Sequence, residues 1–259
     1  MPKQPPSDGG ERDRWERILS TDSEAAFRDF IINQVSPQQD ESVLSVGCGP
    51  GFETAALARY VGVDGTIIGI DVSEEVLAAA RDRCGDLPQA SFAKGDIVDL
   101  PVADESYDLA MAKQVLYAIS DIETALDELF RVIAPGGRVA VTAGDRRTHV
   151  KHTPTDRMQL ADDVYRAEIN HSQLGTRLIG QLPEAGFTME EITPRAKIKT
   201  EFDDQIEQGI DIQRRLLKDS DVFDSEAVDA WEQEMRELNE MGQFLSCSTS
   251  FLYIARKPE

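Results

Sequence analysis

One short stretch constrains the fold of this chain more than any other: an apolar run followed by closely spaced glycines, VLSVGCGPG at residues 43–51. The apolar half predicts a buried strand, and the GxGxG half, followed at once by a helical pattern, predicts a tight strand-to-helix turn. Glycines let the backbone turn sharply and approach a ligand closely. The N-terminus of the next helix offers free N–H groups to an anionic group. The stretch is therefore typical of a cofactor-binding turn.

The pattern after this turn alternates between strands and helices. Apolar strand patterns and helical patterns follow one another with short connections. The strands are predicted at 42–46, 66–70, 91–93, 107–112 and 137–143, the last after a turn at 135–137. The helices are predicted at 54–61, 74–84 with Ser73 as its cap, and 122–133. Alternation of this kind predicts an α/β, Rossmann-like fold with a mostly parallel sheet and helices on both faces. Two later strands, 187–192 and 248–255, bring the expected sheet to seven strands.

The remaining segments predict additional helices outside this sheet. Helical periodicity covers 11–19, 23–34, 154–185 and 203–241, and the first nine residues are polar and rich in proline. We therefore expect a disordered tail (1–9), N-terminal helices contributing to a lid (10–41), a cofactor-binding core (42–202), a helical lid insertion (203–244) and the final core strand (245–259). Cofactors bind at the carboxyl ends of such strands, so the lid is expected there. The alternatives are that these helices only cover one face of the sheet or that they form a homodimer interface.

Two acidic residues follow the second and third predicted strands. Asp71 ends a strand 20 residues beyond Gly51, where a carboxylate can accept hydrogen bonds from both hydroxyls of a ribose. This feature is shared by enzymes that bind NAD. Asp96 and Ile97 follow the third strand, where a carboxylate and a backbone N–H can bind the edge of an adenine. The segment 113–117 follows the fourth strand and should face the cofactor.

Four ordered motifs carry a family resemblance. VLSVGCGPG, GTIIGIDVS, KGDIVDLPVADESYDLA and LFRVIAPGGRVAV resemble the successive motifs of class I S-adenosylmethionine (SAM)-dependent methyltransferases. The chain is most similar to the small-molecule enzymes related to the ubiquinone/menaquinone-biosynthesis methyltransferases, and the likeness covers residues 42–143. The resemblance implies that SAM is the cosubstrate and that a small molecule accepts the methyl group.

The resemblance also implies which residues hold the cofactor. Those around the methionine part are Gly47, Cys48, Gly49 and Gly51, those around the adenosine are Asp71, Val72, Asp96 and Ile97, and Gln114 would sit near the sulfonium. One position departs from the family pattern, because Ser45 stands where the first strand often carries an acid that supports the cofactor's ammonium group.

The sequence assigns no catalytic residue. Methyl transfer from a sulfonium requires alignment and exclusion of water, and it needs a base only when the acceptor must lose a proton. The candidates for contact with the acceptor are Gln114, Tyr117, Asp145, Arg146 and His149, each of which can equally be a packing or solvated residue. Two alternatives stay open: an NAD(P)-dependent oxidoreductase and a SAM-binding regulatory protein without turnover.

Charge and cysteine content limit the partners. The chain has 48 acidic and 27 basic residues, a net charge of −21, and only eight of the basic residues are lysines. Such a surface repels nucleic acid, and diffuse acid with little lysine is typical of proteins from salt-loving organisms. The three cysteines show no CxxC spacing, so we expect no disulfide framework and no metal site. Cys84 and Cys247 also lack the spacing of arsenite methyltransferases. With no apolar run long enough for a membrane span, we expect a cytoplasmic protein.

Overall fold

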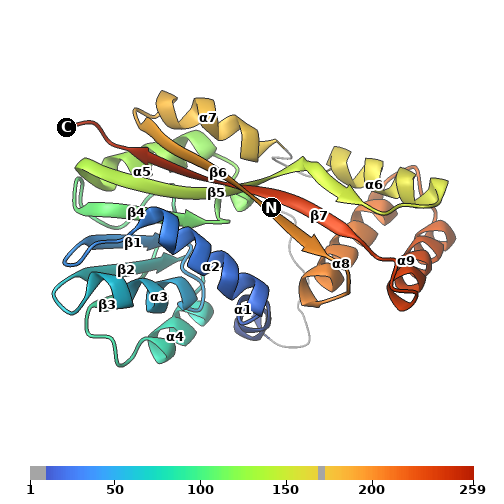
Figure 1. Cartoon of the computed structure of the whole chain (residues 1–259), viewed down its shortest axis with the longest axis horizontal. Coiled ribbons are helices and arrows are strands. Elements are labelled where there is room, and N and C mark those ends of the chain that lie inside the picture. The colour runs from blue at the N-terminus through green and yellow to red at the C-terminus, as the bar shows by residue number, and fades with distance from the viewer. Residues whose placement is uncertain (1–9, 169–172) are drawn as a thin grey trace. The chain divides into compact units, whose positions relative to one another are not determined.

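The computed structural model describes residues 10–168 and 173–259, so the predicted tail at 1–9 lies outside the described residues. Within these ranges the strands form one seven-stranded sheet in the order β3-β2-β1-β4-β5-β7-β6 (Figure 1). The strands are β1 (Ser42–Val46), β2 (Thr66–Asp71), β3 (Ala90–Lys94), β4 (Tyr107–Lys113), β5 (Ile133–Lys151), β6 (Thr188–Lys199) and β7 (Ser246–Arg256). The predicted Rossmann-like α/β fold with a seven-stranded sheet is confirmed.

The first five strands of the sheet order are parallel. In the register, Val43 of β1 lies between Ile67 of β2 and Leu109 of β4. Helices α3 (Phe52–Val61) and α4 (Glu74–Arg83) connect β1 to β2 and β2 to β3, and α5 (Ile122–Val132) connects β4 to β5. Crossovers between parallel strands are right-handed. The crossovers through α3 and α4 lead toward the β3 edge of the sheet, whereas the crossover through α5 leads in the opposite direction, from β4 to β5. Consequently α3 and α4 cover one face and α5 covers the other.

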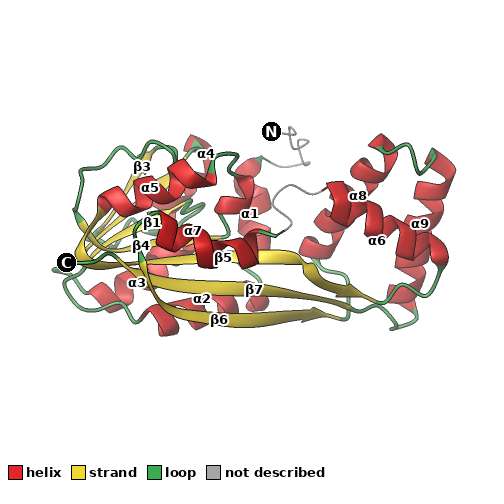
Figure 2. Cartoon of the chain, turned by 90° about the horizontal axis from the view of Figure 1, so that it is seen from above, coloured by secondary structure: helices red, strands yellow, loops and turns green. Residues whose placement is uncertain are grey.

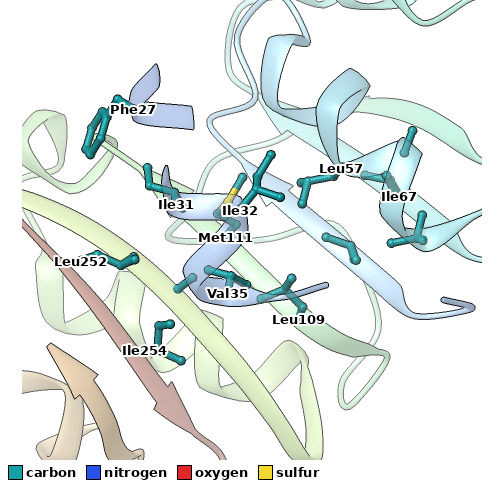
Figure 3. Packing of buried hydrophobic residues seen from close by; sticks show 14 residues of the cluster. Phe27, Ile31, Ile32, Val35, Leu57, Ile67, Leu109, Met111, Leu252 and Ile254 are labelled. Atoms are coloured by element: carbon teal, nitrogen blue, oxygen red, sulfur yellow. The ribbon is translucent and has the colours of Figure 1, made fainter. Parts of the chain in front are cut away.

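An apolar layer joins the N-terminal helices to the sheet. Helix α1 (Glu11–Leu19) precedes α2 (Asp22–Val35), whose apolar side chains pack with those of α3 against the sheet (Figure 3). The cluster contains Phe27, Ile31, Ile32, Val35, Val43, Leu57, Ala58, Val61, Ile67, Leu109, Met111, Ala140, Leu252 and Ile254. Helix α2 is therefore packed on the core of the sheet, since a well-packed apolar layer is what holds a helix to a sheet.

The chain divides into two compact units. The first comprises the residues up to Ala143 with Arg177–Thr193 and Leu252–Glu259, and the second comprises Gly144–Thr176 and Pro194–Phe251. The second unit contains α6 (Asp156–Glu168), α8 (Asp204–Asp219) and α9 (Ser225–Glu240), while α7 (Leu174–Glu184) belongs mostly to the first. A separate core surrounds Trp231, which is 1% exposed. This unit is larger than the predicted insertion at 203–244, because it includes α6.

Strand β5 differs from its prediction. The sequence predicts a turn at Pro135–Gly137 and a strand at 137–143, whereas β5 begins at Ile133 and continues to Lys151 (Figure 2). The turn residues form a register irregularity inside the strand: Tyr107 pairs with Ile133, but Leu109 pairs with Arg138. Backbone hydrogen bonds of Gly136 and Gly137 with Lys257 join β5 to β7, which runs antiparallel to it. The polar residues after Ala143 show no alternation, so pairing rather than pattern extends this strand.

Among the described residues, every helix is too short or too polar to cross a lipid bilayer.

Candidate functional site

Four neighbouring strands end side by side at one edge of the sheet. Because β3, β2, β1 and β4 are adjacent and parallel, the residues at or directly after their carboxyl ends lie in a row. These residues are Gly95, Asp71, Gly47 and Gln114. Backbone hydrogen bonds connect the row, since the Cys48 N–H donates to the Ile70 carbonyl at 3.0 Å and the Gly95 N–H donates to the Asp71 carbonyl at 3.1 Å. The structure thus brings the predicted binding segments together.

The glycine turn requires glycine at its first and last positions. Gly47, Gly49 and Gly51 have φ values of 63°, 52° and 84°, in the left-handed region that favours glycine. A Cβ on Gly47 would lie 2.3 Å from Cγ2 of Val115, and one on Gly51 would lie 3.0 Å from Ala80 of α4. The turn is therefore pressed between the loop after β4 and helix α4. Cys48, inside the turn, is buried with 2% of its surface exposed.

Asp71 is held in place by two backbone donors. The Gly49 N–H donates to Oδ2 at 2.9 Å, and the Ser73 N–H donates to Oδ1 at 3.0 Å. Burial raises the pKa of Asp71, the two N–H groups oppose that rise, and the carboxylate of Glu11 adds to it. Each carboxylate oxygen has two lone pairs, so both oxygens can accept a further hydrogen bond. The carboxylate is positioned to bind a diol.

Ser73 does not cap α4 as its position predicts. It lies at the N-cap, but its side chain accepts no hydrogen bond from the helix, and its hydroxyl donates to Oε2 of Glu11 at 2.6 Å. Helix α1 makes further contacts with α4: the Arg12 N–H donates to Glu75 at 3.1 Å, the Arg12 guanidinium pairs with Asp82 at 3.3 Å, and Glu16 pairs with Arg83 at 2.5 Å. Helix α1 thus lies along α4 beside the residues that follow Asp71.

The residues predicted to bind the adenine differ in exposure to solvent. Val72 is 59% exposed, and Asp96 is exposed and accepts from the Val98 N–H at 3.3 Å. The side chain of Ile97 is buried, with 3% exposed. Val72 and Asp96 therefore offer an exposed apolar surface and an exposed carboxylate at the ends of the neighbouring strands β2 and β3.

The loop after β4 has a strained backbone. Gln114 has a φ of 56°, which is uncommon for a residue other than glycine. Its N–H donates to Oγ1 of Thr142 on β5 at 2.9 Å. The Gln114 side chain and the ring of Tyr117 are both exposed, and half of the Tyr117 surface (52%) is accessible. A fixed backbone with exposed polar side chains is an arrangement that can present groups to an acceptor.

Lys113 does not face the cofactor edge as the sequence predicts. Its ammonium donates to Oε1 of Glu53 at 2.6 Å and to Oε2 of Glu24 at 3.0 Å, with 6% of the side chain exposed. Burial lowers the pKa of Lys113, but the two carboxylates outweigh that effect, so the net pKa is raised. The sequence does not predict this cluster, because its residues on α2, α3 and β4 are far apart in the chain and no local pattern relates them.

The acceptor candidates beyond Ala143 belong to the second unit. Asp145 is 2% exposed, and its carboxylate accepts from the guanidinium of Arg147 and from the hydroxyl of Thr176. The Arg147 hydrogen bond is the main reason that the pKa of Asp145 is lowered. Nε2 of His149 lies 2.7 Å from Oγ of Ser246. Asp145 is thus a structural residue, and the side chain of Arg146 lies outside the described part of the chain.

In the part of the chain that the structure describes, no group of three or more His, Cys, Asp or Glu residues could hold a metal ion. Cys48 and Cys84 are buried thiols, with 2% and 3% of their surfaces exposed. Burial raises the pKa of both, and the carboxylates of Asp71 and Glu53 raise that of Cys48 further. These two thiols therefore stay protonated and do not act as soft metal ligands.

Comparison with known proteins identifies related domains. A family profile described as "Methyltransferase domain" matches residues 37–242. An arsenite methyltransferase of Halobacterium salinarum is 34% identical over 165 residues, which cover 62% of this chain and 41% of that protein. A demethylmenaquinone methyltransferase of Staphylococcus aureus is 32% identical over 127 residues, which cover 49% and 53%. The chain spans about half the length of these curated relatives.

The fold is also similar to solved structures. The YcgJ protein of Bacillus subtilis matches with a TM-score of 0.66 at 20% sequence identity, over 91% of this chain and 99% of that one. This likeness extends well beyond the four motifs, to strands and helices for which the sequence shows little resemblance.

Proposed function

Because this chain belongs to the methyltransferase-domain family of class I SAM-dependent enzymes, we propose that it transfers the methyl group of SAM to a small-molecule acceptor. One observation carries the proposal. The carboxylate of Asp71 and the glycine turn are joined by the 2.9 Å hydrogen bond from the Gly49 N–H, at the edge where four parallel strands end. A diol-binding carboxylate and a turn open to a ligand are thus fixed relative to each other.

The residues at this edge fit the cofactor. Gly47 is exposed, so the backbone of the turn is accessible to a ligand at this position. We assign the methionine part to Gly47, Cys48, Gly49 and Gly51, the ribose to Asp71, the adenine to Val72, Asp96 and Ile97, and the neighbourhood of the sulfonium to Gln114. The polar partners and exposed apolar surface match a ligand with an adenine, a ribose and a charged amino-acid end.

The cofactor, once bound, supplies an activated methyl group. This chain's residues then have to bind and orient the reactants and exclude water. The backbone at Gln114, fixed by Thr142, presents Gln114 and Tyr117 on the exposed side of the loop. We propose these two side chains as contacts for the acceptor, and we assign no general base.

Two measurements test the proposal. Thermal melting of the chain with SAM, S-adenosylhomocysteine and NAD should show stabilisation by the first two, since a ligand that binds the folded state raises its melting temperature by mass action. Transfer of label from methyl-labelled SAM to a panel of small molecules should then identify the acceptor. Stabilisation by NAD alone would replace the proposal with an oxidoreductase, and SAM binding without transfer to any acceptor would favour a regulatory protein.

The placement of the thiols argues against arsenite as the acceptor. That activity is the named function of one relative, and its chemistry relies on accessible thiolates. Here Cys48 and Cys84 are buried with raised pKa values, and Cys247 belongs to the second unit. We therefore favour an organic acceptor.

The net charge of −21 extends the proposal to the protein's surroundings. Diffuse acid makes nucleic acid an unsuitable partner. It also leads us to propose adaptation to high salt, in which screening removes the self-repulsion of the surface. A cytoplasmic location accords with three unpaired cysteines.

We further propose that the N-terminal helices (10–41) and the insertion (203–244) act as lids on the cofactor-binding core (42–202), which the last strand (245–259) completes. For the first of these segments, the contacts of α1 with Ser73 and Glu75 support the proposal. Hydrogen exchange in both segments should slow when S-adenosylhomocysteine and acceptor bind, while the core strands are protected throughout. Exchange that responds only in the glycine turn would reject the lids.

A further inference from the structure

Arg28 is a buried cation with an unmatched donor. It lies on α2, its side chain is 12% exposed, and within the described residues its Nη1 has no hydrogen-bond partner. The nearest carboxylate oxygen, Oε1 of Glu53, is 3.9 Å from Nη1, which makes an ion pair without a hydrogen bond. A buried donor left without an acceptor destabilises the folded state. A ligand that supplies the acceptor would remove this destabilisation.

The guanidinium lies at the glycine turn. Its central carbon is 5.3 Å from the ring centroid of Phe52, and Phe52 and Glu53 are the first two residues of α3, directly after Gly51. The carboxylates of Glu53 and Asp71 both act on the thiol of Cys48 inside the turn. Arg28 is therefore close to the N-terminus of α3, where free N–H groups and the helix dipole already favour a negative charge.

The neighbouring cations are already occupied. Lys113 donates to Glu24 and Glu53 at 3.0 and 2.6 Å. Arg83, whose central guanidinium carbon is 3.6 Å from the Phe52 ring centroid, donates to the Pro50 carbonyl at 2.8 Å and pairs with Glu16. Because Lys113 takes up Oε1 of Glu53 at hydrogen-bond distance, Arg28 is attracted to this carboxylate without being bound by it. Of these three cations, Arg28 alone has an unused donor in a buried position.

We propose that Arg28 binds the α-carboxylate of the methionine part of the cofactor, and that Glu53, held by Lys113, is the positioning residue that keeps the guanidinium beside the glycine turn. The inference rests on the proposed function and adds a binding residue from α2, outside the four sequence motifs. A guanidinium matches a carboxylate in charge and geometry, and such charge-assisted pairs are roughly twice as strong as neutral hydrogen bonds.

Two ligands separate this role from a structural one. S-adenosylhomocysteine carries the carboxylate, whereas its decarboxylated analogue keeps the adenosine, the sulfur and the ammonium but lacks the carboxylate. Calorimetry should show that Arg28→Met weakens S-adenosylhomocysteine binding by about tenfold to a hundredfold, as expected for a hydrogen bond to a charged group. Binding of the decarboxylated analogue should change by less than about twofold. Arg59→Met, which removes an exposed arginine near the end of α3, should leave both affinities unchanged.

Other outcomes overturn the inference in distinguishable ways. Equal weakening of both ligands by Arg28→Met would make Arg28 a structural residue and leave the proposed function intact. Failure of the unaltered chain to bind S-adenosylhomocysteine would reject the proposed function and, with it, this role. Should Arg28→Met melt below the assay temperature, Arg28→Lys provides the same comparison. It keeps the charge but loses the paired donors, so it should weaken S-adenosylhomocysteine selectively and to a smaller extent.

Discussion

Two strands of this chain end on a buried lysine, and the two lysines have different partners. Lys113 ends β4 and is bound by two carboxylates, Glu24 and Glu53, from α2 and α3. Lys151 ends β5 and is bound by the carboxylate of Asp162 at 3.1 Å and the amide oxygen of Gln213 at 2.9 Å, from α6 and α8. The first cluster belongs to the cofactor-binding unit, and the second lies inside the helical unit.

The two clusters differ in which polar atoms are left without a hydrogen-bond partner. Asp162 also pairs with Arg166 at 2.7 Å, and Gln213 donates to the Ala161 carbonyl at 3.0 Å, whereas Oδ1 of Asp162 and Nε of Arg166 have no hydrogen-bond partner among the described residues. In the first cluster, Lys113 occupies Glu53 and leaves the guanidinium of Arg28 incompletely bound. Both clusters therefore keep unmatched polar atoms, but that of the first, Nη1 of Arg28, belongs to the unit that contains the glycine turn, whereas those of the second belong to the helical unit.

The largest expected effect comes from removing each lysine in turn. Lys113→Met leaves two buried carboxylates without their cation, so the free energy of unfolding should fall by about 3–5 kcal/mol. Lys151→Met should cost about 1–3 kcal/mol, because Arg166 still pairs with Asp162 and the main loss is a buried hydrogen bond. Denaturant unfolding followed by circular dichroism measures both. Equal losses would show that the two clusters are energetically alike and would remove the basis of this comparison.

A second change acts on ligand binding. Asp71→Ala removes the carboxylate proposed to accept from both ribose hydroxyls, each worth about 1.5–3 kcal/mol. Affinity for S-adenosylhomocysteine should fall at least tenfold in calorimetry. Asp64→Ala, which removes an exposed acid in the loop before β2, is the control and should leave the affinity unchanged. Unchanged affinity of a folded Asp71→Ala variant would reject the assignment of Asp71.

Acid should affect the two units in sequence. The pKa of Asp71 is raised, so its ionised form is disfavoured in the folded state, and protonation as the pH falls does not destabilise the fold. The pKa of Asp145 is lowered, so its stabilising contribution is present above the unfolded value of 3.8 and is lost only as the pH falls through its lower folded pKa.

Ligand binding should therefore weaken before the second unit loosens. Below the pKa of Asp71, affinity for S-adenosylhomocysteine should fall by about tenfold per pH unit, while near-ultraviolet circular dichroism stays native. Asp71→Asn, which cannot ionise, should flatten this pH dependence. Loss of the native spectrum at the same pH as loss of binding would contradict the proposed order.

Salt should have the smallest effect on stability for each interaction that it screens. Its effect on the melting temperature should be the same for the Lys113 and Lys151 clusters. If the acidic surface is adapted to salt, the melting temperature should rise from dilute buffer to about 1 M KCl, where the Debye length is about 3 Å. Buried pairs are screened much less than exposed charges, so Lys113→Met and Lys151→Met should show the same rise as the unaltered chain. A flat response would reject the adaptation, and a smaller rise in one variant would mean that its cluster is accessible to salt.

The sequence by itself determined the edge at which four parallel strands of this protein end. The glycine turn, the strand ending at Asp71 and the alternation of strands and helices are short-range patterns, and short-range patterns set local conformation. Parallel strands in a right-handed arrangement then bring the residues after β1, β2, β3 and β4 together without further information. The seven strands follow from the same kind of reasoning.

Only the tertiary structure decided the partners of the buried charges. Lys113 meets Glu24 and Glu53 across 89 and 60 positions in the sequence, and no local pattern relates residues so far apart. The length of β5 and the boundary of the second unit likewise depend on pairing with β7 and on packing around Trp231. Leaving a buried charge without an oppositely charged partner is strongly destabilising, and only the packing of the whole fold brings such partners together.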